Sequence, residues 1–166
     1  SCKGFFFRTP CPMKTTRISI PNEIMLGSVR DLIKEGHSVV IMTKGLSMLP
    51  FIEGKKDSVL LVKPEDLKRG DIALAEVAPD KYVLHRVLEV NDGKVILKGD
   101  GNYRGQEICP LKKVAGKVKE VQHMDGSATD PQSPMQMRRW QRWMGIPAIV
   151  RRYYLAFYRR IKRITP

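Results

Sequence analysis

The chain has 166 residues and a formal net charge of +13, and 42% of its residues are hydrophobic. A chain of this length fits one domain with appendages, and its apolar content excludes disorder throughout. No run approaches the roughly 18 apolar residues of a membrane-spanning helix. The run Phe5–Phe7 is also too short for the apolar stretch of a signal peptide.

The cysteines are Cys2, Cys11 and Cys109, an odd number without the spacing of metal ligands. A disulfide framework and a structural zinc site are therefore not expected, although a Cys2–Cys11 bridge stays open. We expect no metal and no other cofactor. A reducing compartment is the simpler interpretation, so the expected location is the cytoplasm, including attachment at the membrane periphery.

Residues 1–21 are expected to form a flexible N-terminal segment, and residues 22–35 predict one short helix. Asn22 can cap the start of this helix, and Gly36 stands where a helix commonly ends. The residues at helical spacing that would form its buried stripe are Met25, Val29 and Leu32.

Short β-rich runs separated by turns follow up to Gln122. The predicted strands are Val39–Thr43, Ser58–Val62, Asp71–Val77, Tyr82–Val90, Lys94–Lys98 and Val114–Val121. The segment Asn91–Gly93 between two of them favours a hairpin turn, because Asn and Gly tolerate positive φ. Residues 22–122 therefore predict one mostly-β domain, a coiled sheet or partly open barrel.

The C-terminal part begins with a predicted Gly/Ser/Pro linker over residues 123–136. Residues 137–164 follow with helical periodicity, and Pro147 should kink or restart that helix. Its predicted apolar face consists of Trp143, Pro147, Val150, Tyr154, Phe157, Ile161 and Ile164.

Ser47 is the first candidate for chemistry. It follows the predicted strand Val39–Thr43, with Gly45 before it to permit a tight turn and Pro50 after it to end any regular ladder. A hydroxyl at such a corner can be exposed, with its own backbone N–H aimed at a developing oxyanion. The same pattern also fits a turn serine that hydrogen-bonds locally.

His85 and Asp100 are the second and third candidates. Strand alternation places His85 on the same face as Val83 and Val87, where a satisfied, half-buried histidine is also common. Asp100 lies in the turn Lys98–Asn102, where it can orient an imidazole or cap the turn. The other histidines, His37 and His123, look incidental.

The order of these blocks resembles the signal-peptidase/LexA-like serine peptidase family across about Val39–Val121. The blocks are Ser47-Met48-x-Pro50, Lys68-Arg69-Gly70-Asp71-Ile72, Tyr82-Val83-Leu84-His85-Arg86-Val87, Leu97-Lys98-Gly99-Asp100-Gly101-Asn102 and Val114-Ala115-Gly116-Lys117-Val118. Within that family, His85-Arg86-Val87 is most similar to the archaeal and endoplasmic-reticulum type signal peptidases, which use a Ser/His pair. The membrane anchor that such enzymes place before the catalytic serine is not expected here.

This resemblance implies that Ser47 is the nucleophile, His85 its general base and Asp100 a supporting acid. It also implies a site-shaping role for Gly45, Met48, Pro50 and Asn102, and leaves Glu107 as an alternative acid. The roles are chemically consistent, because a serine hydroxyl needs a base within hydrogen-bond reach. Histidine, with a reference pKa of about 6.5, suits that task, and a carboxylate at its far nitrogen would fix the tautomer.

The predicted C-terminal helix suggests a partner. Residues 131–166 contain nine Lys and Arg residues and no acidic residue. Aromatic and aliphatic residues flanked by arginines are typical of a helix that lies in a membrane interface, so residues 137–164 are expected to bind an anionic membrane surface. A helix packed on its own domain or on a partner protein fits equally, whereas nucleic acid is the least favoured partner.

The sequence therefore predicts a serine endopeptidase that cleaves a peptide or protein substrate, such as a leader or signal-like segment. A self-cleaving LexA-like regulator is an alternative, although His85 replaces the usual lysine. A non-catalytic β-module that binds nucleic acid or peptide through its basic tail is the alternative from another class.

Overall fold

The computed structural model describes residues 15–17 and 26–164. In this part of the chain, nine strands form one sheet in the order β1-β2-β3-β8-β4-β5-β6-β7, with β9 paired to β8. The strands are β1 (Thr15–Arg17), β2 (Ser38–Met42), β3 (Ser58–Val62), β4 (Ile72–Ala78), β5 (Lys81–Asn91), β6 (Lys94–Lys98), β7 (Glu107–Pro110), β8 (Val114–Gln122) and β9 (Ala128–Thr129). Only the β1–β2 pair is parallel among these ladders.

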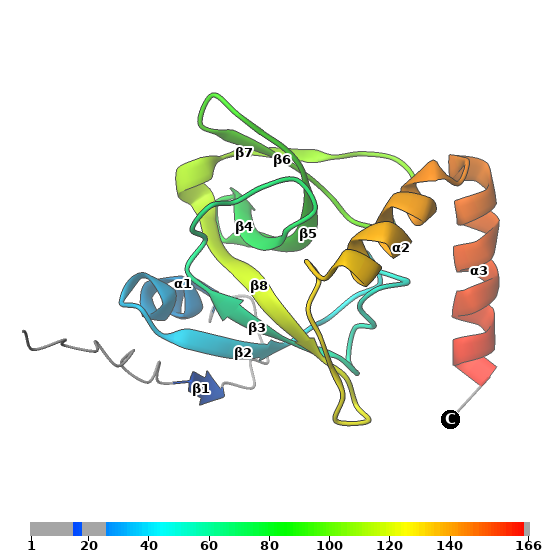
Figure 1. Cartoon of the computed structure of the whole chain (residues 1–166), viewed down its shortest axis with the longest axis horizontal. Coiled ribbons are helices and arrows are strands. Elements are labelled where there is room, and N and C mark those ends of the chain that lie inside the picture. Colours follow the sequence, from blue (N-terminus) through cyan, green and yellow to red (C-terminus); the bar gives the residue numbers. More distant parts are fainter. Residues whose placement is uncertain (1–14, 18–25, 165–166) are drawn as a thin grey trace, which may run out of the picture.

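The sheet curls into a half-barrel, so the predicted mostly-β, partly open architecture is confirmed. Register shifts in β3–β8, β4–β8 and β5–β6 accompany this curvature, since bulges bend and twist a strand. One apolar core gathers α1 (Leu26–Lys34) with β2, β3 and β8, and a second gathers β4 to β7. Figure 1 shows α1 at one side of the molecule and α2 (Pro134–Gly145) and α3 (Ala148–Ile164) at the other.

Each of the predicted strands overlaps an observed one, and the runs Ser58–Val62 and Lys94–Lys98 match their strands at both ends. The predicted hairpin between β5 and β6 is confirmed, with Asp92 at φ 47° and Gly93 at φ 71°. Such a pair of positive φ values matches the right-handed twist of the flanking strands. The strands β1, β7 and β9 were not predicted.

The predicted N-terminal helix is present as α1, which buries Val29 and Ile33. Ile33 therefore takes the place that the prediction gave to Leu32, which is only half-buried. Asn22 and Met25 lie outside the described residues. So do Cys2, Cys11 and, except for β1, the predicted flexible segment 1–21.

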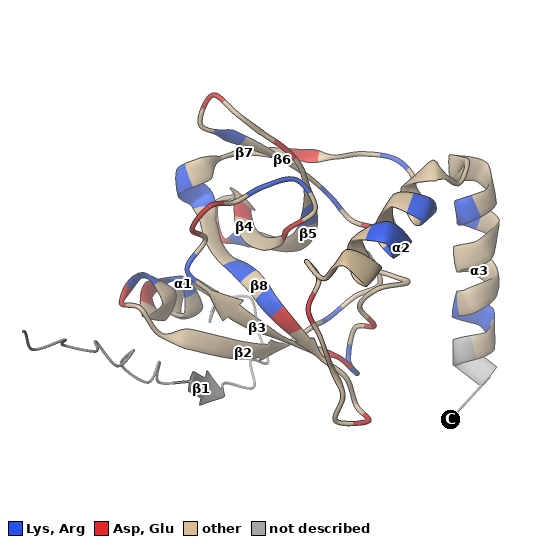
Figure 2. Cartoon of the chain, in the orientation of Figure 1, with Lys and Arg blue, Asp and Glu red and all other residues tan. Residues whose placement is uncertain are grey.

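The C-terminal part differs more from the expectation. The predicted linker 123–136 contains β9, which pairs with β8 and so fastens this segment to the sheet. The helical region is divided at Ile146-Pro147 into α2 and α3, as proline requires. Figure 2 shows basic residues and no acidic residue along both helices. No helix in the described part of the chain is long and apolar enough to cross a bilayer.

Candidate active site

The connection from β2 to β3, residues 43–57, carries Ser47 and is called the serine loop below. Its two ends are held together by Thr43, whose backbone N–H and hydroxyl both donate to the Asp57 carbonyl oxygen, at 3.0 and 2.8 Å. The Lys55 N–H in turn donates to the Thr43 carbonyl at 2.8 Å. A long connection closed in this way presents its middle residues in a fixed conformation.

Ser47 lies half-buried in this loop, between Gly45 at φ +80° and Pro50, which follows a cis peptide bond. Met48 is buried in the core that α1 forms with β2, β3 and β8, and so fixes the loop to that core. Among the described residues, neither the hydroxyl nor the backbone N–H of Ser47 has a hydrogen-bond partner. The alternative interpretation, a turn serine that hydrogen-bonds locally, is therefore not what the structure contains.

The turn between β6 and β7 packs directly on the backbone of the serine loop. The Gly101 N–H donates to the Ser47 carbonyl at 2.7 Å, and the Asn102 N–H closes the turn by donating to the Gly99 carbonyl at 2.9 Å. A Cβ at Gly99 would lie 2.5 Å from the Ser47 carbonyl oxygen. Glycine is thus required for this approach, and the turn fixes the orientation of the Ser47 peptide group.

His85 lies in β5 opposite Ala73 of β4 and is almost fully buried. Its Nδ1 lies 2.8 Å from a carboxylate oxygen of Glu107, the first residue of β7. An ionised carboxylate only accepts hydrogen bonds, so Nδ1 is the donor in its hydrogen bond to Glu107. In the neutral tautomer with the proton on Nδ1, Nε2 has the lone pair that a general base needs.

Ser47 and His85, which are far apart in the sequence, line the same cavity of about 320 Å³. Its other lining residues include the apolar side chains Leu26, Ile41, Met48, Ile52, Leu74 and Leu84. No hydrogen bond joins Ser47 to His85 in the structure. Catalytic hydrogen bonds of this kind often tighten only when a substrate is bound.

Asp100 does not hold His85, contrary to the expectation that it orients the imidazole. Its carboxylate accepts three hydrogen bonds, at 3.0, 2.9 and 2.7 Å, from Arg86, the residue that follows His85 in β5. The reason is strand alternation, which sends His85 and Arg86 to opposite sides of β5. Burial raises the pKa of the Asp100 carboxyl, and the adjacent Arg86 guanidinium opposes that shift.

Helix α2 seals the Arg86 side of β5. The Arg86 guanidinium lies 5.2 Å from the ring centre of Trp140 and 5.1 Å from that of Phe51. The Trp143 indole N–H donates to the Asp100 carbonyl at 2.8 Å. Both tryptophans are buried, so the expectation that Trp143 belongs to an exposed interfacial face is wrong. The first half of the predicted tail therefore packs on the β domain.

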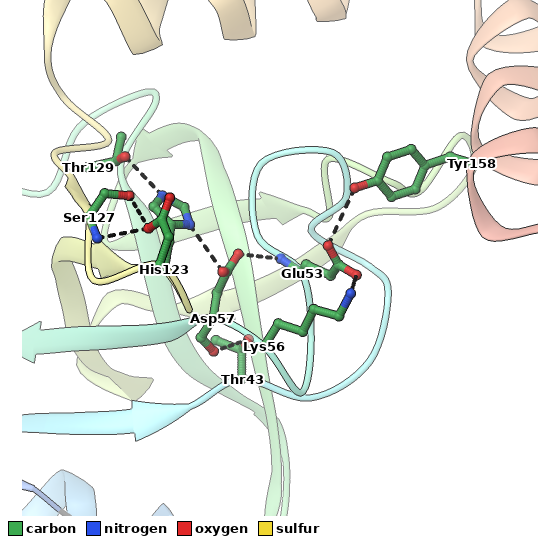
Figure 3. Close-up of polar contacts among 9 residues, drawn as sticks. Thr43, Glu53, Lys56, Asp57, His123, Ser127, Thr129 and Tyr158 are labelled. Atoms are coloured by element: carbon green, nitrogen blue, oxygen red, sulfur yellow. Dashed lines mark hydrogen bonds and ion pairs between the residues drawn. The ribbon is translucent and has the colours of Figure 1, made fainter. Parts of the chain in front are cut away.

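A second polar network supports the far end of the serine loop (Figure 3). Asp57 accepts from the Glu53 N–H at 2.8 Å and lies 3.1 Å from Nδ1 of His123, whose Nε2 lies 2.9 Å from the Thr129 hydroxyl. His123, which looked incidental in the sequence, thus connects the β8–β9 turn to the loop. Its partners are Asp57, directly before β3, and Thr129 in β9, and no local sequence pattern links these positions.

Asp57, His123 and Thr129 thus form a hydrogen-bonded series of carboxylate, histidine and hydroxyl. At the other site Glu107 and His85 are hydrogen-bonded, and Ser47 lines the same cavity as His85. Thr129 lies in β9, paired with Val121 of β8, so its backbone belongs to a sheet ladder. Ser47 lies in a turn, where its N–H has no partner and can stabilise an oxyanion. The Ser47 site also has the larger cavity, about 320 Å³ against about 150 Å³ beside His123 and Thr129.

No protein-family model matches the chain, and no curated protein matches it with significant similarity. Within the described residues, no group of three or more His, Cys, Asp and Glu side chains is placed to hold a metal ion. The arrangement of Ser47, His85 and Glu107 is itself suited to acyl transfer. Sequence reasoning named Glu107 only as an alternative, because the pairing of Leu97 with Glu107 across β6 and β7 cannot be read locally.

Proposed function

We propose that the protein is a serine endopeptidase of the signal-peptidase/LexA-like type, which cleaves peptide bonds with a Ser47/His85 pair. One observation carries this proposal. Two distant segments bring a carboxylate-bound histidine and a serine hydroxyl with no hydrogen-bond partner among the described residues to one largely apolar cavity. A purely structural serine and histidine would satisfy their polar groups locally rather than leave them facing a cavity.

The proposed reaction begins when Ser47 Oγ attacks the carbonyl carbon of the scissile peptide bond. His85 Nε2 accepts the hydroxyl proton and later donates it to the leaving amine. In this proposal the Ser47 N–H donates to the oxyanion of the tetrahedral intermediate. The hydrogen bond from the Gly101 N–H to the Ser47 carbonyl supports this role, because it fixes the loop that carries Ser47. Water then attacks the acyl-enzyme as His85 takes its proton, and the return of that proton to Ser47 Oγ releases the carboxylic acid product.

Glu107 takes the supporting role in this proposal. Its hydrogen bond to Nδ1 keeps the proton on that nitrogen and stabilises the imidazolium that forms during the reaction. Asp100 instead holds Arg86, and through the Gly99–Asn102 turn it supports the loop beneath Ser47. Asp100 is therefore assigned to architecture, and Glu107 to positioning the base.

The cavity supports an extended peptide with apolar side chains as the substrate. The end of β2 and the start of β5, residues 41–43 and 82–85, both line it. Among the described residues, neither segment is paired on the side away from its ladder partner, since the described β1 pairs with residues 38–40 and β6 with residues 86–91. An extended chain can add to such edges by backbone hydrogen bonds. A leader or signal-like segment has the required apolar character.

Cleavage of a complex peptide library tests this function. Wild-type protein is expected to create new N-termini after apolar segments, whereas Ser47→Ala creates none and retains its substrates in a pull-down. A fragment of the enzyme itself, formed at a rate independent of its concentration, would favour the self-cleaving alternative. Absence of any Ser47-dependent cleavage would overturn the peptidase proposal in favour of a binding module.

A further inference from the structure

Helix α3 has two different apolar faces. One packs on the catalytic domain, where Leu155 is buried with Leu49 and Trp143. The other lies about a third of a turn or more away, as 3.6 residues per turn require, and contains Val150 and Phe157. These side chains are 51% and 65% exposed. Of the stripe that periodicity predicts, Val150 and Phe157 are thus left uncovered, whereas the Tyr154 ring lies 5.5 Å from that of the buried Trp143.

The exposed stripe is wide and continuous over the helix. Ile149 and Tyr153, at 63% and 70% exposure, extend it along the edge that faces away from the domain. We call these two residues together with Val150 and Phe157 the outer stripe. A connected group of large apolar side chains on a surface marks an interaction site, unlike apolar residues scattered singly.

Arginines lie along one side of the outer stripe, and no acidic residue does. Arg160 lies at its edge and Arg159 lies further round the same helix, both exposed. The guanidinium of Arg152, on the same side, lies 5.5 Å from the ring centre of Tyr103. Residues 131–166 contain no Asp or Glu, and Figure 2 shows the basic character shared by α2 and α3. Long arginine side chains can lie along an apolar surface while their guanidinium groups reach anionic groups above it.

We propose that the outer stripe of α3 inserts into the surface of an anionic lipid bilayer, with the adjacent arginines on the headgroup phosphates. Tyrosine, phenylalanine and aliphatic side chains beside cations are the combination that an in-plane interfacial helix needs. Nucleic acid would satisfy the arginines but leave the apolar stripe in water. A protein partner would need a strongly acidic rim around an apolar groove to match the same surface.

The other face of α3 makes this attachment relevant to the serine loop. Besides the Leu155–Leu49 packing, the Tyr158 hydroxyl donates to a Glu53 carboxylate oxygen at 3.4 Å (Figure 3). Both Leu49 and Glu53 belong to the serine loop. A bilayer bound to the outer stripe is therefore separated from that loop by a single helix, so the catalytic domain is held at the lipid surface. Lipid binding itself does not depend on the proposed peptidase activity.

Vesicle co-sedimentation of the full chain tests the apolar part of the proposal. The protein is expected to pellet with phosphatidylcholine vesicles containing about 30 mol% phosphatidylglycerol, and much less with phosphatidylcholine alone. The triple variant Val150→Ser, Tyr153→Ser, Phe157→Ser should stay in the supernatant. The control variant Met124→Ser, at another exposed apolar residue, should still pellet. Equal binding by the triple variant would overturn the proposal.

Charge reversal tests the electrostatic part. Arg159→Glu and Arg160→Glu together should lower partitioning onto anionic vesicles by about 25-fold or more, since each basic residue contributes roughly fivefold. Reversal of the exposed lysines Lys81 and Lys119 on the sheet should change it little. Added salt should weaken binding only in part, because apolar contact is not screened.

A tryptophan reporter locates the contact. Both native tryptophans are buried under the catalytic domain, so a Phe157→Trp substitution adds the one tryptophan expected to respond to lipid. Its emission should shift to shorter wavelength with anionic vesicles, whereas that of Met124→Trp should not. Failure of the wild-type chain to bind any vesicle, or binding to RNA with a steep salt dependence in its place, would overturn the proposal whatever the peptidase assay gives.

Discussion

His85 and Arg86 are neighbours in β5, and each is held by one carboxylate, but the two pairs have opposite surroundings. Arg86 and Asp100 are 2% and 3% exposed and joined by three hydrogen bonds beneath α2. His85 is held by a single hydrogen bond, from its Nδ1 to Glu107, whose side chain is 33% exposed, and it lines a cavity that Ser47 also lines. Alternation along β5 thus places the buried Arg86–Asp100 ion pair on one side of the strand and the His85–Glu107 pair, which faces the cavity, on the other.

The difference shows which property identifies a candidate catalytic group. Asp100 lies in the more distinctive motif, yet its hydrogen-bonding capacity is used by Arg86, which also donates to the Gly70 carbonyl. His85 keeps one nitrogen available beside a serine that has no partner. Free bonding capacity that faces a cavity points to chemistry, whereas complete satisfaction points to folding.

The largest expected effect is on the reacting pair. Ser47→Ala and His85→Ala should each remove detectable peptide cleavage. In serine enzymes whose catalytic groups act as a unit, the loss of one such group lowers kcat by about 10⁶-fold. The double variant should be no worse than either single variant. Circular dichroism should show an unchanged fold for Ser47→Ala, because that hydroxyl has no partner to lose. Additive losses would contradict a joint role.

The next effect concerns the acid that holds His85. Glu107→Gln should lower kcat by about 10²- to 10⁴-fold while leaving the melting temperature nearly unchanged, because a partly exposed single hydrogen bond contributes little stability. The exposed Glu89, which lies in β5 with His85, provides the control, and Glu89→Gln should behave as wild type. Wild-type kcat in Glu107→Gln would remove Glu107 from the site.

Asp100→Asn should show the reverse pattern, with a large effect on stability. Removing one partner of a buried ion pair leaves an uncompensated charge and costs about 3–5 kcal/mol of unfolding free energy. Urea unfolding measures this loss, with the exposed turn variant Asp92→Asn as control. The folded fraction of Asp100→Asn should keep a histidine-dependent pH profile. A stable but inactive Asp100→Asn would instead support the original expectation that Asp100 orients the base.

The smallest effect is expected at the contact between α2 and the Asp100 turn. Trp143→Phe keeps most of the packing but leaves the Asp100 carbonyl without its indole donor, at a cost of about 1–3 kcal/mol. Truncation of the chain before α2 should be far more damaging, because Trp140 and Trp143 would both be lost. Unchanged urea unfolding in Trp143→Phe would show that α2 does not support the turn.

The sequence predicts most of this sheet because its strands have alternating patterns bounded by turn residues. Residues 94–98, for example, follow a two-residue turn and match β6 at both ends. Strand β7 escapes prediction because it has four residues and ends in Pro110. The acid at His85 is missed for a related reason, since Glu107 reaches it only through the β6–β7 register.

The C-terminal helices show a different limit of sequence reasoning. Periodicity finds the apolar stripe of α3 but cannot say whether a stripe faces the domain or solvent. The domain-facing side contains Arg151, buried beside the Trp143 ring at 6.0 Å, and therefore does not look apolar in the sequence. Likewise, Trp140 and Trp143 look interfacial until Arg86 and Asp100 are known to lie beneath them.

Covalent labelling of the serine tests the central claim most directly. Wild-type protein is treated with serine-acylating probes, a fluorophosphonate and a β-lactone, and the adduct is located by peptide mass spectrometry. The account predicts one adduct on Ser47, absent in Ser47→Ala, much slower in His85→Ala and slowed in Glu107→Gln. Labelling should be retained in Asp92→Asn. An adduct on Thr129, or no adduct on Ser47 with either probe, would contradict the assignment of Ser47 and His85 as the reacting pair.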